Sequence, residues 1–277
     1  MPLIAMNREI GSLGKDVAQG VAEALGIKVQ HHEMIDTLAN RTRIRKSHVI
    51  SFLEGKQGLI ERLTTDQLSL RLLTADEILS LAESEGGIIM RGWGATSLLK
   101  EVPHAVRVCV SASRTVRIQR MMERLGSTDE REVERIVDQN DESSGVVMRR
   151  HFHIGSRDID EYDMCLNTDR LSVAECVAEI VGLVKSARFA ETEASRAKLR
   201  DIAVVHRVRA ALRTEASTSH CKLHVTADNG RVTLEGVVDS VAQSEACATV
   251  AARLKGVASI DNRLRSGEAI SARLRGG

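Results

Sequence analysis

A turn near the start of the chain carries the residues best suited to binding phosphate. The stretch NREIGSLGKDVAQG follows a short apolar run, Leu3 to Met6, and precedes apolar residues at helical spacing from Val17 to Leu25. Free backbone N–H groups at the start of a helix bind anions, and the helix dipole adds to the attraction. We therefore expect a strand, a phosphate-binding turn and a helix in this order.

This turn matches the phosphate-binding pattern GxxxxGK[ST] only in part. Gly14 and Lys15 stand at the required places, whereas Glu9 replaces the first glycine and Asp16 replaces the serine or threonine. A glycine-containing turn before a helix is more often plain punctuation between two elements. The pattern alone leaves two interpretations of Lys15 open: a phosphate-binding lysine, or a solvated lysine of the first helical turn.

A second basic cluster is expected on the helix from Thr115 to Leu125. Arg117, Arg120 and Arg124 recur at spacings of three and four residues, which places them on one helix face. A guanidinium group binds two phosphate oxygens at once. The alternative is a solvated basic face paired with nearby acidic residues, which we prefer for Arg124.

The composition limits the class of protein. The chain has 277 residues, 43% of them hydrophobic, and a formal net charge of +1. We therefore expect two globular domains with aliphatic cores and no nucleic acid partner. The five cysteines include no CxxC pair, which argues against a disulfide framework or a zinc site and favours a reducing cytoplasm. No apolar run approaches the roughly 20 residues of a membrane span, and no signal peptide is evident.

Strand-like and helix-like segments alternate along the first two thirds of the chain. This order predicts a parallel sheet with helices on both faces. The expected strands are Leu3 to Met6, Lys28 to Gln30, Ile88 to Met90, Val106 to Val110 and Met164 to Leu166. We expect this first domain to span residues 1–188.

A smaller domain follows a helical linker at residues 189–200. It is predicted to hold a helix (Asp201 to Thr214), a hairpin turning at Asp228-Asn229-Gly230, a second helix (Ser240 to Leu254) and a last strand (Ala258 to Leu264). We expect this αββαβ domain to span residues 201–267 and residues 268–277 to form a tail.

Several segments of the first domain, taken in order, resemble the cytidylate kinase-like family. They are REIGS with the helix ending ALGI, then IIMRGWGATSLL, VRVCVSASRTVRIQRMMER and LNTDRLSVAECV. The similarity covers roughly residues 3 to 186 and implies a P-loop kinase-type α/β fold. It further implies ATP-dependent phosphoryl transfer to a nucleoside monophosphate, with CMP or dCMP preferred and Mg²⁺ bound between the phosphates.

The resemblance also assigns roles to individual residues of this chain. Those expected to bind ATP are Gly11, Ser12, Leu13, Gly14, Lys15 and Asp16, with Asp16 as a metal ligand as well. The expected catalytic residues are Lys15, Arg117, Arg120, Arg149 and Arg150. The expected acceptor site consists of Arg8, His31, Asp36, Arg91 and Gly92. A metal site at the His31-His32 pair is disfavoured, because adjacent side chains of an extended chain point to different sides.

The chain departs from cytidylate kinases proper at two further places. In the region of the expected lid, Asp141 to Asp163, the chain has DQNDESSGVV before its two adjacent arginines, where a denser Arg/Asp run is usual, and Gly92 replaces an acidic residue. Asp16 could bind the metal or repel ATP. Two alternatives to the kinase therefore stay open: a nucleotide-binding sensor without turnover that signals through the second domain, or a scaffold that binds no nucleotide.

The second domain resembles a BON domain over Asp201 to Arg265. The resemblance rests on VTLEGVVDS and LKGVASIDNRL, and it implies binding to a lipid or protein surface, a regulatory role or oligomerisation. The cluster Arg207, Arg209 and Arg213 could face an anionic ligand, but a solvated helix face is the more common arrangement. No catalytic constellation is expected in this domain.

Overall fold

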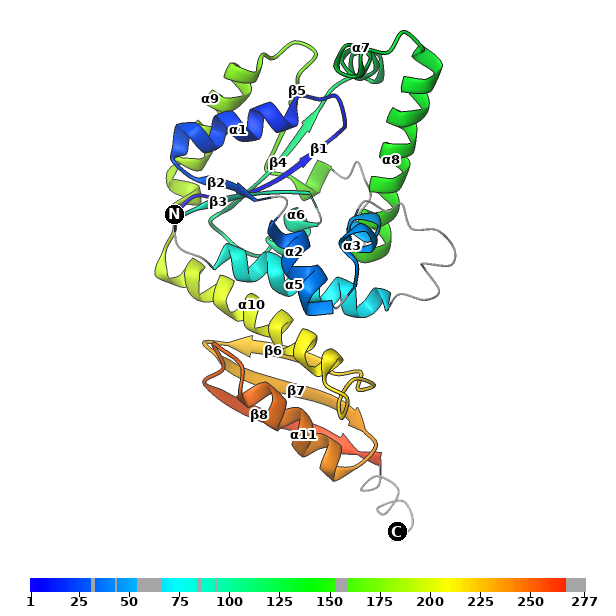
Figure 1. Ribbon diagram of the computed structural model, residues 1–277. Helices are drawn as coiled ribbons and strands as arrows, with labels where there is room; N and C mark the ends of the chain where they lie inside the picture. Colours follow the sequence, from blue (N-terminus) through cyan, green and yellow to red (C-terminus); the bar gives the residue numbers. More distant parts are fainter. Residues whose placement is uncertain are drawn as a thin grey trace. The chain divides into compact units, whose positions relative to one another are not determined.

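The computed structural model describes residues 1–30, 33–42, 44–53, 66–83, 86–92, 94–152 and 159–267 (Figure 1). These residues form two compact units. The first unit contains residues 1–65 and 84–192, and the second contains residues 66–83 and 193–277. The chain therefore leaves the first unit once, for a single helix, before it builds most of the second.

The first unit is built on a parallel sheet of five strands in the order β2-β3-β1-β4-β5. All four neighbouring pairs run parallel, which confirms the predicted parallel sheet. The carboxyl ends of such strands meet at one edge, where α/β proteins bind their ligands. The strands are β1 (Leu3–Arg8), β2 (Lys28–Gln30), β3 (Ile88–Arg91), β4 (Ala105–Ser111) and β5 (Met164–Asn167).

Helices flank this sheet, as the alternation of elements predicts. α1 (Gly14–Leu25) and α9 (Val173–Val184) pack together over one face (Figure 1). The main core consists of aliphatic and sulfur-containing side chains from these elements, among them Ile4, Val21 and Ile180. The remaining helices are α2 (Glu33–Thr42), α3 (Lys46–Leu53), α6 (Ala95–Leu98), α7 (Arg114–Leu125), α8 (Glu130–Phe152), and the short 3₁₀ turns η1 (Ile159–Glu161) and η2 (Ala187–Phe189).

Helix α9 begins at a capping box, which fixes where the chain turns after the last strand of the sheet. The Ser172 hydroxyl accepts a hydrogen bond from the Glu175 N–H at 3.2 Å, and the Glu175 carboxylate accepts one from the Ser172 N–H at 2.8 Å. Two backbone groups that a helix leaves unpaired are satisfied in this way. The strand-to-helix junction predicted from LNTDRLSVAECV is therefore present.

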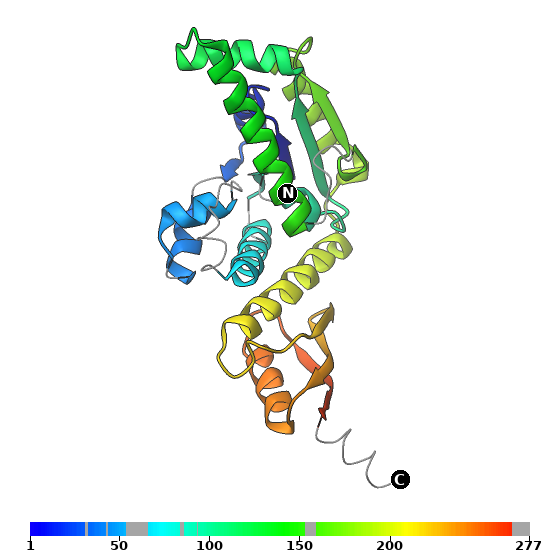
Figure 2. The same ribbon diagram turned by 90° about the vertical axis from the view of Figure 1, so that its right-hand side faces the viewer.

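The second unit has a three-stranded sheet of mixed direction in the order β6-β7-β8. Strands β6 and β7 run antiparallel, and β7 and β8 run parallel. α10 (Glu193–Thr214) and α11 (Val241–Ala252) contact each other and pack against this sheet (Figure 2). The strands are β6 (His224–Asp228), β7 (Arg231–Val238) and β8 (Ser259–Ser266), so the predicted αββαβ order is present.

The predicted hairpin turn lies between β6 and β7. Asn229 and Gly230 both have positive φ, 48° and 77°, as a two-residue turn of the hairpin type requires. The Asp201 carboxylate accepts hydrogen bonds from both backbone N–H groups, at 2.8 and 2.9 Å. Helix α10, which carries Asp201, thereby fixes the turn.

Two boundaries differ from the sequence-based expectation. The helix predicted to begin at Asp201 begins at Glu193, so α10 occupies most of the predicted linker. α5 (Gln67–Ala82), which the sequence assigns to the first domain, packs against α10 and belongs to the second unit by its contacts. Buried residues lie all around α5, so its sequence has no amphipathic face that would indicate a partner.

Among the described helices, none combines the length and the apolar character that crossing a bilayer requires.

Candidate functional site

The turn between β1 and α1 is compact and is held by hydrogen bonds between its own residues. Leu13, the N-cap of α1, has a left-handed backbone with φ of 59°, and Gly11 has φ of 79°. Ser12 is fully buried, and its hydroxyl donates to the Glu9 carbonyl at 2.8 Å. The Ser12 N–H donates to the same carbonyl at 3.2 Å. The backbone of Glu9 therefore organises the turn that Gly11 and Ser12 make.

Both glycines of this turn are required by close approaches. A Cβ on Gly11 would lie 2.7 Å from the Arg117 carbonyl oxygen, and a Cβ on Gly14 would lie 2.7 Å from the Arg8 Cβ. Real Cβ atoms almost never come within 3.0 Å of another heavy atom in this way, and the positive φ of Gly11 adds a further penalty for any L side chain. The turn is closed only because these two positions have no side chain.

The turn borders a pocket of about 730 Å³ at the carboxyl edge of the sheet. Among the described residues, the backbone N–H groups of Leu13, Gly14 and Lys15 donate no hydrogen bond, so they are available to an anion. Basic side chains outnumber acidic ones around the pocket. Its lining consists of Arg8, Glu9, Gly11, Leu13, Gly14, Lys15, Asp16, Arg91, Arg120, Met121, Glu123 and Arg124.

Two of these cations are incompletely paired within the described part of the chain. Lys15, in the first turn of α1, is exposed and forms no ion pair with any described residue. Arg91, the last residue of β3, is only 9% exposed, and its Nε has no hydrogen-bond partner in the described part of the chain. Burial lowers the pKa of Arg91, and the nearby Asp16 carboxylate partly offsets this effect. A buried, incompletely bonded guanidinium facing a pocket is suited to an anionic ligand.

Arg120 lies in the pocket wall, and its guanidinium is held by the segment that follows β5. Nη1 donates to the Thr168 hydroxyl at 2.9 Å, and Nη2 donates to the Thr168 carbonyl at 2.7 Å. The Thr168 hydroxyl in turn donates to the Ser12 carbonyl at 3.0 Å. The hydroxyl of Thr168, a residue that the sequence interpretation does not single out, therefore connects Arg120 to the turn.

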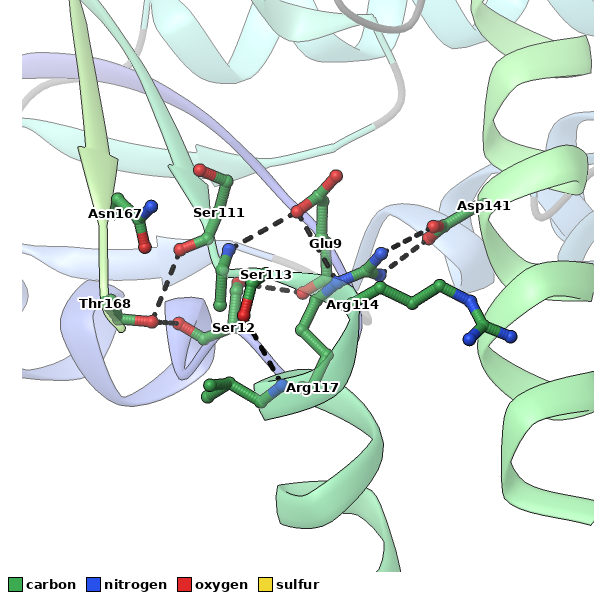
Figure 3. A network of polar contacts seen from close by, with 12 residues as sticks. Glu9, Ser12, Ser111, Ser113, Arg114, Arg117, Asp141, Asn167 and Thr168 are labelled. Atoms are coloured by element: carbon green, nitrogen blue, oxygen red, sulfur yellow. Dashed lines mark hydrogen bonds and ion pairs between the residues drawn. The ribbon is translucent and has the colours of Figure 1, made fainter. Parts of the chain in front are cut away.

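Arg117 occupies a different place from the one the sequence predicts. Its side chain is 2% exposed and absent from the pocket lining. Nη1 and Nη2 donate to the two carboxylate oxygens of Asp141 at 2.9 and 2.7 Å, and Nε lies 3.6 Å from the Glu9 carboxylate (Figure 3). The spacing of α7 places Arg117 on the expected helix face, but its partner Asp141 comes from α8, a pairing that no local pattern could indicate.

The predicted lid and acceptor residues are only partly near the pocket. Arg149 is exposed on α8, the side chain of Arg150 and the whole of His31 lie outside the described residues, and α8 continues to Phe152, so half of the predicted lid is a regular helix. Asp36 is exposed and pairs with the Lys46 ammonium at 2.7 Å. Gly92 follows Arg91 with φ of 74° but does not line the pocket.

Asp16 is the predicted metal ligand, and its carboxylate lines the pocket in the first turn of α1. In the described part of the chain, no group of three or more His, Cys, Asp or Glu side chains could hold a metal. Mg²⁺ in phosphate sites needs one or two carboxylates, with phosphate oxygens and water as its other ligands. A single carboxylate beside a turn with free backbone N–H groups fits that requirement.

Comparisons with known proteins identify a family for each of the two parts of the chain. The sequence profile of the Cytidylate kinase-like family matches residues 3–170, and that of the BON domain matches residues 201–268. An uncharacterized protein from Eubacterium ventriosum is 20% identical, with a TM-score of 0.53 over 67% of this chain and 99% of that one. Shikimate kinase from Bacteroides thetaiotaomicron is 14% identical, with a TM-score of 0.42 over 67% of this chain and 99% of the other.

No curated protein matches the chain significantly. The family profile covers more than half of the sequence and includes every strand of the first sheet, the turn at Gly11 to Gly14 and the pocket. The match at the C-terminal end includes the three strands and two helices of the αββαβ arrangement. The chain belongs to the cytidylate kinase-like family and carries a C-terminal BON domain.

Proposed function

We propose that this protein transfers a phosphoryl group from ATP to a nucleoside monophosphate, with CMP or dCMP as the preferred acceptor. Family membership supports nucleotide-dependent phosphoryl transfer as the class of reaction. The observation that carries the proposal is the turn of β1 and α1, which presents unpaired N–H groups and the Lys15 ammonium to one pocket. Phosphoryl transfer needs such positioning and charge neutralisation more than covalent catalysis.

Different residues of the pocket are proposed to bind different parts of the ATP triphosphate and its metal ion. The N–H groups of Gly14 and Lys15 bind phosphate oxygens at the helix N-terminus, and Lys15 neutralises charge that develops on the transferred group. Arg120, fixed by Thr168, binds the donor nucleotide beside the turn. Asp16 would hold Mg²⁺, which neutralises phosphate charge when bound.

Arg91 is proposed to bind the phosphate of the acceptor. Its guanidinium is buried at the end of β3, lines the pocket and keeps one N–H without a partner among the described residues. Arg8 lines the same pocket and is proposed to assist it. The preference for a cytosine base comes from the family resemblance, and no geometry in the pocket identifies the base.

The proposal is tested by measuring ADP release with ATP, Mg²⁺ and each of CMP, dCMP, UMP and AMP. Turnover with CMP or dCMP at the highest kcat/KM supports it, and the reaction should stop when the metal is chelated. Binding of ATP without ADP release in the presence of any acceptor would instead favour a nucleotide sensor. An absence of ATP binding would leave only the scaffold interpretation.

The sensor is retained as a second candidate because specific observations favour it. Arg117 is engaged by carboxylates, and Asp36 pairs with Lys46 instead of facing the pocket. Glu9, Asp16 and Glu123 also add negative charge to the lining. A thermal shift with ATP and Mg²⁺ separates this candidate from the scaffold, since a ligand at a hundred times its Kd adds about 2.7 kcal/mol to the free energy of unfolding.

The BON domain is proposed to bind a protein or lipid surface and to regulate the kinase. The described residues of this unit contain no cluster of acidic, histidine or cysteine side chains that could hold a metal. We place the enzyme in a reducing cytoplasm, because ATP is its proposed donor and its five cysteines are free thiols.

A further inference from the structure

We propose that Glu9 and Arg117 are positioning residues that hold the phosphate-binding turn in shape. In the pattern GxxxxGK[ST], Glu9 occupies the place of the first glycine. The simplest view of this departure is a tolerated loss of the pattern that weakens the site. The contacts of Glu9 indicate the opposite, and the inference rests on the proposed binding of a triphosphate at this turn.

Both the backbone and the side chain of Glu9 fasten the turn. Its N–H donates to the Val110 carbonyl at 3.2 Å, which ties the start of the turn to β4. Its carbonyl accepts from the N–H and the hydroxyl of Ser12. Its carboxylate Oε2 accepts from the Ala112 N–H at 3.3 Å and lies 3.6 Å from Arg117 Nε. A glycine at this position could make the backbone contacts but neither of the side-chain contacts.

Arg117 contacts the same turn through its backbone as well as its side chain. The backbone of Arg117 lies so close to Gly11 that a Cβ there would be 2.7 Å from the Arg117 carbonyl oxygen. Its guanidinium is held from the far side by both carboxylate oxygens of Asp141 on α8 (Figure 3). A bidentate pair of this kind fixes the orientation of a guanidinium more firmly than a single contact. Asp141, Arg117 and Glu9 thus form a bridge from α8 to the turn.

The charges of this bridge explain how a carboxylate is tolerated beside a phosphate site. Glu9 lines the pocket, and an unpaired carboxylate a few Å from a triphosphate would repel it by an energy of the order of kcal/mol. Arg117 lies against Glu9 and is almost completely buried, so its charge is not screened by water. Arg117 therefore supports binding by offsetting part of the Glu9 charge without touching the ligand, although the same guanidinium is also paired with Asp141.

The variant Glu9→Gly gives a decisive test, because it restores the glycine of the pattern. We expect the Kd for ATP with Mg²⁺, measured by calorimetry on the full chain, to rise about tenfold or more, since a hydrogen bond and an ion pair of the carboxylate are lost. Glu9→Gln should lie between Glu9→Gly and the wild type. If Glu9→Gly binds ATP as tightly as the wild type or more tightly, the inference is overturned.

The matched control is Glu134→Gln. Glu134 is also a carboxylate that pairs with an arginine of α7, at 3.1 Å from Arg114 Nη1, but it lies on α8 away from the turn. Its loss should leave the Kd within about twofold of the wild-type value. An equal loss of affinity in Glu134→Gln would show that any weakening of the contact between α7 and α8 has the same effect, which would also overturn the assignment.

A double-variant cycle tests the neutralising role of Arg117. Arg117→Met leaves the Glu9 carboxylate unpaired in the pocket, so ATP should bind more weakly than in Glu9→Gln. Adding Glu9→Gln to Arg117→Met removes the unpaired charge and should recover part of the lost affinity. Additive losses in the double variant would contradict the pairing. If Arg117→Met fails to fold, the comparison of Glu9→Gly with Glu9→Gln still decides.

Amide hydrogen exchange without ligand separates this inference from the proposed function. Exchange at residues 10–15 should be faster in Glu9→Gly than in the wild type and unchanged in Glu134→Gln. If the wild type binds no ATP, the proposed function fails, yet exchange still shows whether Glu9 orders the turn. Unchanged exchange together with unchanged ATP affinity in Glu9→Gly would refute the positioning role.

Discussion

Cations that line the pocket of the first unit differ in their bonding from two arginines of α10 in the second unit. Around the pocket of the first unit, cations are incompletely paired: Arg91 keeps a buried N–H without a partner among the described residues, and Lys15 forms no ion pair with them. In the second unit, two arginines of α10 form ion pairs with carboxylates at the two ends of α5. Arg207 pairs with Glu83 at 2.5 Å and donates to the Lys255 carbonyl at 2.7 Å, and Arg213 pairs with Asp66 at 2.9 Å.

This difference separates a binding site from a structural contact. Arg207 and Arg213 hold the two ends of α5, because Asp66 is the N-cap of that helix and Glu83 is its C-cap. Their charges are neutralised within the unit, so they offer little to an external anion. Arg91 and Lys15 retain bonding capacity in a pocket, where a ligand can satisfy it. Residue type alone does not distinguish the two uses.

The largest expected effect is on turnover in Lys15→Ala. Removing the ammonium takes away charge neutralisation in the transition state, so kcat/KM for ATP should fall about a thousandfold, or roughly 4 kcal/mol. ADP release measures this loss. Lys28→Ala, which removes an exposed lysine from β2, is the control and should retain full activity. Full activity in Lys15→Ala would break the comparison, since the unpaired cation would have no function.

The free energy of unfolding should depend on pH because His206 of the second unit is largely buried. Burial lowers the pKa of His206 to about 4, with Arg209 and Arg71 adding to the shift and Asp76 opposing it. Between pH 6.5 and about 4, the unfolded chain binds a proton that the folded chain does not. The free energy of unfolding should therefore fall as the pH drops through this window, by about 3 kcal/mol in total, with no further loss below it.

Urea titrations monitored by circular dichroism at several pH values measure this dependence. His206→Gln removes the titrating group, so its stability should vary less between pH 7 and pH 4.5. His220→Gln is the control, because it replaces an exposed histidine of the same unit and leaves His206 in place. An unchanged slope in His206→Gln would show that His206 is not buried as a neutral side chain.

Gly11→Ala should be more harmful than Gly126→Ala, although both glycines have similar positive φ. The φ values are 79° and 62°, but a Cβ on Gly11 would lie 2.7 Å from a carbonyl oxygen, whereas one on Gly126 would have nothing within 4 Å. Gly126→Ala should cost about 1 kcal/mol of stability and Gly11→Ala about 2 kcal/mol. Only Gly11→Ala should weaken ATP binding. Thermal unfolding and calorimetry measure the two effects, and equal losses in both variants would show that the close approach at Gly11 has no consequence.

The smallest expected effect concerns the α10 arginines. Arg207→Met should lower the free energy of unfolding by about 1–2 kcal/mol, because Glu83 loses its partner in a mostly buried contact. ATP affinity should stay within about twofold of the wild type. Arg200→Met is the control: its pair with Glu193 is largely exposed and should contribute less than about 0.5 kcal/mol. A loss of ATP affinity in Arg207→Met would contradict the purely structural role assigned to this arginine.

The sequence predicts the elements of both units well. Short apolar runs between helix-like segments predict each strand of the first sheet, and Asn229-Gly230 predicts the hairpin. Both signals come from residues close together in the chain. The turn from Gly11 to Asp16 is also visible as a pattern. Of the candidate site, Lys15, Arg91 and Arg120 do line one pocket, while Arg117 and Asp36 do not.

The features that the sequence did not predict depend on contacts between residues far apart in the chain. α5 is buried on all sides, so its sequence cannot tell which unit it joins. Arg117 and Arg120 are one turn apart on α7 and look equivalent, yet one is bonded to Asp141 and the other lines the pocket.

The sequence by itself determined the strands and the turn, since these follow from periodicity and from residues close together in the chain. It also indicated the family, through the resemblance of several segments to cytidylate kinase-like proteins. Only the tertiary structure decided which cations remain available to a ligand. The reason is physical: a cation that forms an ion pair with a carboxylate within the protein is less available to a ligand. The fold decides which carboxylates lie close enough, and it places Asp141 of α8 against Arg117 of α7.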